Sequence, residues 1–185
     1  MEEEEKIISA TDEDQLWEKV IADFKADPDP LEYHAVLEQN DRRIILDIFN
    51  NHAVGFEAVA YVTFSAYLYG RDNFRFSIYN EGFTEEIGKF FGMQDFLLGY
   101  RNFDQRFIIK TNNEQKLSSL FADMNVRDTL ISLPNLSLGI VEYTLEEADG
   151  KVPFLELKIE KAINDPAMLR KIYHTFFSVL LLVEA

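Results

Sequence analysis

The chain has 185 residues, a size that fits one domain, so we expect residues 1–185 to fold together. Its net charge of −15 argues against nucleic acid and anionic membranes as partners, because both are bound through lysine and arginine. The absence of cysteine excludes disulfides, thiol nucleophiles and thiolate zinc sites, and it fits a reducing cytosol. Hydrophobic residues make up 47% of the chain, enough to build a core without a metal. We therefore expect a cytoplasmic protein.

The start of the chain is strongly acidic. Residues 1–30 hold 11 acidic and 3 basic side chains, a balance of −8. The opening MEEEEKII lacks the basic and apolar regions of a secretory signal. Because a terminal charge run is usually solvated, residues 1–10 are predicted to form a disordered acidic tail; the alternative is an electrostatic hook for a basic partner. The apolar run at 176–183 is too short to cross a bilayer, which takes about 20 residues.

The first half of the chain predicts one helix and then strands. Thr11 or Asp12 can cap a helix that runs to about Ala26, where the sequence DPDP ends it. LEYHAVLE and RRIILDIF follow as extended runs joined by a turn at 39–41. The stretch 53–69 alternates as a half-buried strand, and the alanines on its apolar face predict a closely packed helix. FRFSIY, after a turn at GRDN, is the fourth antiparallel strand.

The second half alternates helices and strands. A short helix is predicted at 84–91, and Thr111 with Glu114 has the spacing of a capping box before a helix with an apolar stripe at Leu117, Leu120, Phe121 and Met124. VRDTLISL predicts a further helical piece. LSLGIVEYTL and VPFLELKIE flank a turn at 146–151 and predict a hairpin, and Asp165–Pro166 opens a final helix. The fold class is α+β: a mainly antiparallel sheet of about six or seven strands packed with N-terminal, central and C-terminal helices.

Residues 100–111 read YRNFDQRFIIKT and raise the question of a site. We interpret them as extended, which places Asp104 and Arg106 on one face and Phe103 and Phe107 on the other. In the structural interpretation the two charged side chains pair or hold the backbone of neighbouring loops. In the catalytic interpretation Asp104 is a general base and Arg106 binds an anion. The structural one is favoured, since nothing in the sequence supplies a third catalytic group.

The stretch that resembles a known family is GYRNFDQRFIIKTNNEQKLSSLF. The spacing of Gly99, Phe103, Asp104, Arg106 and Phe107 resembles the signature of an uncharacterised bacterial family, in which a Phe-Asp-x-Arg-Phe stretch precedes a strand, a helix, a hairpin and a C-terminal helix. The chain's GIVEYTLEEADGKVPFLELKIEKAINDPAMLRKIYHTFFSVLLLVE resembles that ending, so the likeness covers about the last half of the chain. The family brings no established activity and implies no substrate.

Other chemistry is sparse. His34, His52 and His174 have no second ligand at metal-binding offsets; we expect His34 to be a surface or satisfied polar residue, His52 a turn residue and His174 a helix-packing residue. The sequence contains neither a phosphate-binding glycine motif nor a GxSxG elbow. No metal and no cofactor are therefore expected.

Three tyrosines form the most function-like feature. Tyr61, Tyr67 and Tyr69 share one face of the strand at 53–69. They can line an aromatic groove for a ligand, or they can pack under a helix with their hydroxyls at the rim. The sequence leaves these alternatives open.

Three functional hypotheses remain. The first and favoured one is a non-enzymatic protein-interaction module that binds another protein or forms a homodimer, and it requires an exposed apolar patch. Small acidic secretion-type chaperones are similar to it in size, charge and element order. The second is a binder of a small apolar or aromatic ligand, with a cavity beside Tyr61 and Tyr67. The third is an enzyme that uses Asp104 and Arg106, with His34 brought near by the fold.

Overall fold

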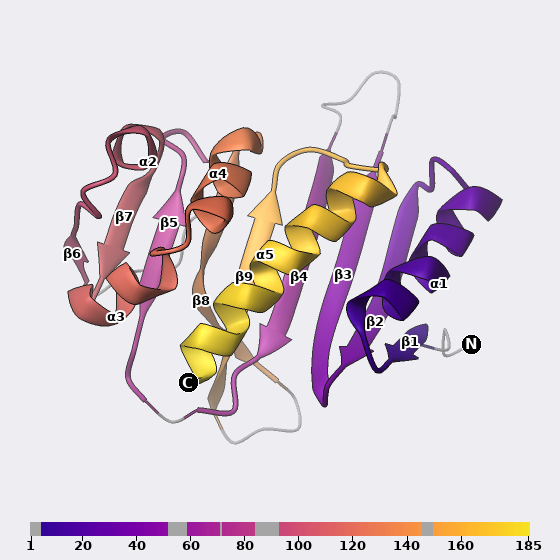
Figure 1. Cartoon of the computed structure of the whole chain (residues 1–185), viewed down its shortest axis with the longest axis horizontal. Coiled ribbons are helices and arrows are strands. Elements are labelled where there is room, and N and C mark those ends of the chain that lie inside the picture. Colours follow the sequence, from indigo (N-terminus) through magenta and orange to yellow (C-terminus); the bar gives the residue numbers. More distant parts are fainter. Residues whose placement is uncertain (1–4, 52–58, 71, 84–92, 146–149) are drawn as a thin grey trace.

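The computed structural model describes residues 5–51, 59–70, 72–83, 93–145 and 150–185. Within these ranges the strands form one mixed, mostly antiparallel sheet of nine strands, in the order β1-β2-β3-β4-β9-β8-β5-β7-β6 (Figure 1). The α+β class predicted from the sequence is confirmed. The helix predicted at 84–91, His52 and the first part of the strand predicted from residue 53 lie outside the described residues.

The strands are β1 (Ile7–Ala10), β2 (Glu32–Gln39), β3 (Arg42–Asn50), β4 (Ala60–Tyr67), β5 (Phe76–Tyr79), β6 (Gln94–Asp95), β7 (Ile108–Thr111), β8 (Leu136–Thr144) and β9 (Lys151–Ile159). The helices are α1 (Glu13–Ala26), α2 (Arg101–Arg106), α3 (Glu114–Leu120), α4 (Met124–Ser132) and α5 (Pro166–Glu184). The sheet therefore has more strands than the six or seven predicted. The additional strands are too short for an alternation of apolar and polar residues to show in the sequence.

Residues 7–10 correct the prediction of a disordered tail over 1–10. They form β1, which runs parallel to β2 with Ile7 opposite Val36. Ile8 is buried in the common core. The strand forms because the edge of β2 offers unpaired backbone groups and the core offers a place for an isoleucine.

Helix α1 begins and ends as predicted. The Asp12 side chain accepts a hydrogen bond from the backbone N–H of Gln15 at 2.9 Å, so Asp12 rather than Thr11 is the cap. The helix buries Leu16, Trp17, Val20 and Phe24. Each such side chain contributes about 1.5–3 kcal/mol when fully buried, which holds α1 to the sheet.

The turn between β2 and β3 is also confirmed. Asn40 and Asp41 have φ of 50° and 60°, the left-handed region required at both central residues of a type I′ turn. Asn and Asp tolerate this region better than most residues.

The strand order could not be predicted from the sequence. β4 and β5 follow each other in the chain, but the β8–β9 hairpin lies between them: β4 pairs with β9, and β5 pairs with β8. The hairpin itself was predicted, and it is antiparallel from Leu136 opposite Ile159 to Thr144 opposite Lys151.

Two helix starts in the middle of the chain differ in detail from the prediction. Asn113, not Thr111, caps α3, because its side chain accepts from the N–H of Lys116 at 3.0 Å. Thr111 ends β7, and its hydroxyl accepts from the N–H of Asn113. Met124 is 61% exposed at the start of α4, whereas Leu117 and Leu120 are buried as predicted.

Helix α5 crosses the middle of the sheet. Asp165 caps it and Pro166 opens it, as predicted. Phe176 packs against Phe64 of β4 with ring centroids 6.1 Å apart, and the nearby Ala66 is buried. The expected close packing of a helix on the alanine-bearing face of β4 is therefore confirmed.

The helices described here lie on one face of the sheet (Figure 1). They share a single hydrophobic core with that face. The opposite face, called here the open face, carries the other half of each strand's alternating side chains. Among the described helices, none is long and apolar enough to span a membrane.

Candidate functional site

The interpretation of residues 100–111 as an extended segment is wrong for its first half. Residues 101–106 form α2, and only Ile108–Thr111 is a strand. Phe103 and Phe107 still lie on one side, with ring centroids 4.8 Å apart, because a separation of four residues returns to the same face in both a helix and a strand. The aromatic spacing alone thus could not distinguish the two.

Asp104 and Arg106 do not pair with each other; each holds backbone. The Asp104 carboxylate accepts from the N–H groups of Leu98 and Gly99, at 2.9 and 2.8 Å. Arg106 Nη2 donates to the carbonyl of Leu133, at 2.8 Å, and so ties α2 to the end of α4. These contacts match one of the two forms of the structural interpretation.

The rest of the motif is also engaged in packing. Phe103 is fully buried and contacts Phe121, with ring centroids 5.6 Å apart. Phe107 is buried, and Gly99 adopts φ of +89°, a conformation suited to glycine. Asn80, which the sequence did not single out, donates to the carbonyl of Arg106 at 3.2 Å and accepts from the N–H of Leu136 at 2.8 Å.

His34 lies far from this motif. It is on β2, and six strand spacings separate β2 from β7, roughly 29 Å at about 4.8 Å each. The fold therefore does not bring His34 to Asp104 and Arg106. Its ring instead contacts the carboxylate of Asp47 on β3, so it is a satisfied polar residue as predicted.

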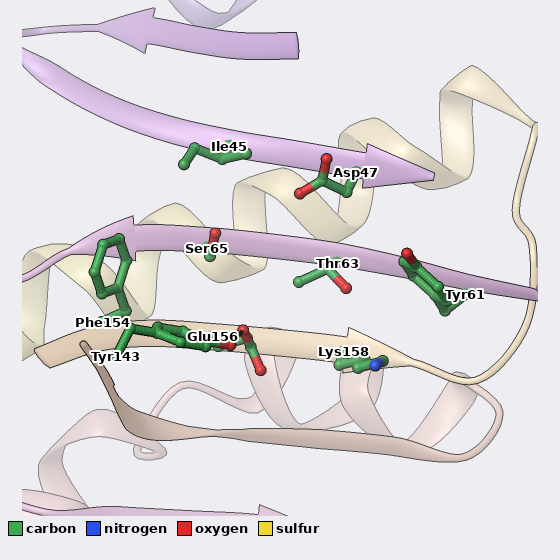
Figure 2. A pocket seen from close by; sticks show the side chains of 9 residues that line it. All are labelled: Ile45, Asp47, Tyr61, Thr63, Ser65, Tyr143, Phe154, Glu156 and Lys158. Carbon is green, nitrogen blue, oxygen red and sulfur yellow. Dashed lines mark hydrogen bonds between the residues drawn. The ribbon is translucent and has the colours of Figure 1, made fainter. Parts of the chain in front are cut away.

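The open face contains a hollow of about 440 Å³ across β3, β4, β8 and β9 (Figure 2). Thr63 and Ser65 of β4 form its floor, with relative exposures of only 9% and 8%. Three charged side chains line it: Asp47, Glu156 and Lys158. Ile45 and the aromatic residues Tyr61, Tyr143 and Phe154 complete the lining.

The two ends of the hollow differ in chemistry. At one end the ammonium of Lys158 lies 4.8 Å from the centroid of the Tyr61 ring, and Tyr61 stacks on Phe49. At the other end the Tyr143 hydroxyl donates to Glu156 beside Phe154 (Figure 2). The lysine therefore lies toward the Tyr61 end and the glutamate toward the Phe154 end.

Tyr67, Tyr69, Tyr143 and Phe154 form what we call the aromatic cluster. Phe154 contacts Tyr67 and Tyr143 edge to face, with centroids 5.7 and 5.5 Å apart. Tyr69 contacts Tyr67 at 4.6 Å. The three tyrosines are 37%, 68% and 43% exposed in chain order, so much of this aromatic surface meets water.

The three predicted tyrosines are thus divided between two places. Tyr67 and Tyr69 belong to the aromatic cluster, while Tyr61 lies at the other end of the hollow. The described helices lie on the other face of the sheet, where Phe64 and Ala66 of β4 are buried. Tyr143 and Phe154 were missed, although the alternation of LSLGIVEYTL and VPFLELKIE carried the signal that places them on one sheet face.

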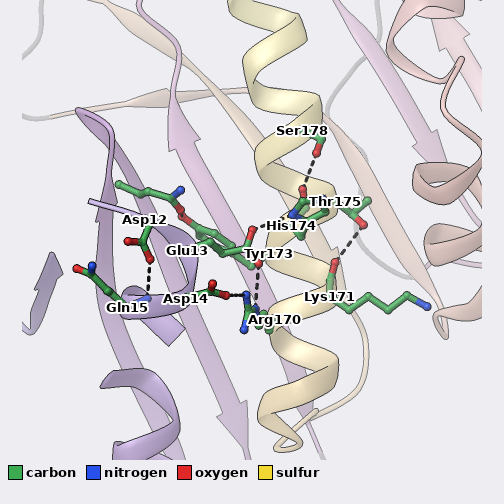
Figure 3. Close-up of polar contacts among 11 residues, drawn as sticks. Asp12, Glu13, Asp14, Gln15, Arg170, Lys171, Tyr173, His174, Thr175 and Ser178 are labelled. Carbon is green, nitrogen blue, oxygen red and sulfur yellow. Dashed lines mark hydrogen bonds and ion pairs between the residues drawn. The ribbon is translucent and has the colours of Figure 1, made fainter. Parts of the chain in front are cut away.

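On the side of the sheet that carries the helices, a cluster of polar side chains links α1 to α5 (Figure 3). Glu13 accepts from Arg170 Nε at 3.0 Å and contacts His174 Nδ1 at 2.7 Å. The hydrogen bond that Arg170 donates to Asp14, followed by the one it donates to Glu13, raises the pKa of Arg170. His174 is 68% exposed, so it is a surface partner of Glu13 and not the packing residue predicted. Exposed pairs of this kind contribute about 0–1 kcal/mol.

Across the described ranges, no group of three or more His, Asp and Glu side chains is arranged to hold a metal ion. In comparisons with known proteins, no family model matches the chain, and no curated protein or solved structure gives a significant match.

Proposed function

We propose that the protein is a non-enzymatic interaction module of the bacterial cytoplasm that binds a segment of another protein on its open face. One observation carries the proposal: the hollow across β3, β4, β8 and β9 adjoins an exposed aromatic cluster on a sheet face that the described helices leave uncovered. Clustered, exposed aromatic side chains are typical of residues that dominate protein interfaces.

The size of the part of the open face that holds the hollow favours a segment over a whole domain. β3, β8 and β9 have nine residues each and β4 has eight, so the four strands span about 27 by 19 Å. That is about 500 Å², less than the roughly 800 Å² that each partner buries in a standard interface. A single helix or extended stretch would fill it.

Charge favours a partner other than a second copy. Two copies would combine net charges of −15 each, and self-repulsion would oppose their association. A partner segment with basic side chains would gain from the same field.

The small-ligand hypothesis has less support. It required a cavity between the tyrosine face and a covering helix, but the hollow is open, and Asp47, Glu156 and Lys158 line it. A small apolar molecule there would remain in contact with water and charge. Native mass spectrometry of the untagged protein tests this alternative, since a retained ligand would add a mass that denaturation removes.

The enzyme hypothesis has less support, because Asp104 and Arg106 are already engaged with backbone groups. Both carboxylate oxygens of Asp104 accept from backbone N–H groups, and Arg106 is committed to the Leu133 carbonyl. A base in this state would have to give up two bonds before taking a proton.

Photo-crosslinking tests the interaction module. A benzophenone amino acid would replace Tyr69, beside the hollow, and in a matched control it would replace Leu181, which is 43% exposed on α5. We expect a heterologous crosslink in native lysate from the Tyr69 position alone, and its loss when Tyr67→Ser is added. Equal products from both positions, or products insensitive to Tyr67→Ser, would refute the proposal. A crosslinked dimer would assign the face to self-association and overturn the choice of partner.

A further inference from the structure

We propose that Lys19 of α1 keeps the protein from joining a second copy of itself along the outer edge of β1. This edge is separate from the hollow, so the proposed function does not depend on it. A sheet edge that pairs freely with another chain leads to association or aggregation. Three features bear on the edge: the backbone groups that β1 presents, the contact that Lys19 makes with one of them, and the net charge of the chain.

β1 is the last strand on one side of the sheet (Figure 1). It runs parallel to β2, and the backbone N–H of Val36 donates to the carbonyl of Lys6 at 2.8 Å. In a parallel ladder alternate residues of a strand bond to the same neighbour, so the backbone groups of Ile8, two residues further on, also face β2. Those of Ile7 and Ser9 therefore point away from the sheet.

These outward backbone groups have the arrangement that another β1 would match. In the described part of the chain the strand order ends at β1, so no strand of the same chain lies beyond it. If two copies met antiparallel, with Ile7 of each opposite Ser9 of the other, both pairs would exchange N–H···O bonds across a two-fold axis. The carbonyl of Ser9 would be an acceptor in both pairs.

Lys19 occupies this carbonyl. Its ammonium donates to the carbonyl oxygen of Ser9 at 2.6 Å. Lys19 is exposed, so the ammonium is in contact with water. A strand placed against Ser9 would have to displace this bond or take the charge out of water, and burying a charge without a charged partner is costly. Lysine at a sheet edge is one of the common features that prevent two sheets from joining.

The net charge of −15 on each copy also opposes association, but salt separates its effect from that of Lys19. The Debye length falls from about 8 Å at 0.15 M salt to about 3 Å at 1 M, so repulsion between copies is screened. The contact between Lys19 and Ser9 is local and remains. Removing the charge of Lys19 makes the chain more negative, so a variant that associates would do so against its own charge.

Analytical ultracentrifugation of the full chain tests this role over a concentration series at low and high NaCl. The main variant is Lys19→Met, which keeps an apolar stem and removes the ammonium. Lys25→Met, at an exposed position in the last turn of α1, removes the same charge elsewhere. The double variant Lys19→Met with Ser9→Pro removes the outward N–H of residue 9, and proline is tolerated in an edge strand where the N–H faces solvent. Circular dichroism would establish that each variant is folded.

We expect Lys19→Met alone to approach twice the chain mass of 21.5 kDa as its concentration rises, and more readily at high salt. The unmodified protein and Lys25→Met should remain monomeric, and adding Ser9→Pro should restore the monomer. In the associated Lys19→Met protein, hydrogen exchange at the amides of Ile7 and Ser9 should slow about tenfold or more, because these outward groups become bonded between copies.

Three results would overturn this role for Lys19. If Lys19→Met stays monomeric at both salt concentrations, the bond to Ser9 only attaches α1 to β1, whatever its effect on the melting temperature. If the unmodified protein associates at high salt, charge alone keeps the copies apart. If Ser9→Pro does not prevent the association of Lys19→Met, the copies meet through another surface.

Discussion

The hydroxyl of Tyr173 on α5 donates to Oε1 of Gln39 on β2, at 2.8 Å. Tyr173 is fully buried and Gln39 is 7% exposed, so this bond lies inside the core. Trp17 from α1 packs edge to face with the same tyrosine ring, with centroids 5.6 Å apart. One side chain therefore joins the first helix, the last helix and the sheet.

Tyr173→Phe should lower the free energy of unfolding by about 1–3 kcal/mol, because it leaves the buried amide oxygen of Gln39 without its donor. Urea denaturation followed by circular dichroism would measure it. Adding Gln39→Leu should recover part of the loss, since replacing both partners by apolar groups removes the unpaired atom. An unchanged urea midpoint in the single variant would contradict the role of this bond.

Two tyrosines should make the fold sensitive to alkali. Burial, with a smaller contribution from the charge of Glu13, raises the pKa of Tyr173; burial and then the hydrogen bond to Asp23 raise that of Tyr33. An unfolded tyrosine loses its proton near pH 10, so the stability from both groups is complete below that pH and is lost progressively above it. Urea midpoints measured from pH 8 to 11 should fall above about pH 10.

The variants Tyr173→Phe and Tyr33→Phe provide the control for this pH dependence. Each should fall less steeply with pH than the unmodified protein, because phenylalanine cannot ionise in the unfolded chain. A parallel fall in all three proteins would assign the alkaline effect to other groups.

Asp104→Ala should destabilise the protein by about 1–3 kcal/mol, because it removes both acceptors of the Leu98 and Gly99 N–H groups. Thermal unfolding would report the change. The control is Asp128→Ala on the exposed side of α4, which should shift stability by less than about 0.5 kcal/mol. Equal melting temperatures for the two variants would show that the backbone contacts of Asp104 contribute nothing.

Gly139→Ala should also be destabilising, since a Cβ at this position would lie 2.6 Å from the carbonyl oxygen of Phe76. That atom belongs to the backbone of β5 and can move only if the strand moves, for which we expect a cost of about 1–3 kcal/mol. Gly70→Ala, where a Cβ meets nothing within 4 Å, is the matched control. If both variants unfold at the same urea concentration, β5 and β8 have more freedom than the close approach implies.

Several features of this protein were determined by the sequence itself. Asp12, Asp165 and the Asn40–Asp41 turn act on backbone groups only a few residues away, so their roles could be predicted without the fold. The α+β class followed for the same reason, because most of its elements show a clear local periodicity. Interactions between residues that are close in the chain can be predicted from the sequence alone.

Only the tertiary structure decided the rest. α2 was predicted as a strand because Phe103 and Phe107 share a face in either conformation; the helix brings Asp104 to the loop before it and Arg106 to the end of α4. The hollow joins Asp47, Tyr61, Tyr143 and Glu156 from four different strands, and it exists because the β8–β9 hairpin lies beside β4. Which strands become neighbours depends on how the whole sheet is buried under its helices. That burial comes from contacts between residues far apart in the chain, and the local periodicity of the sequence does not show them.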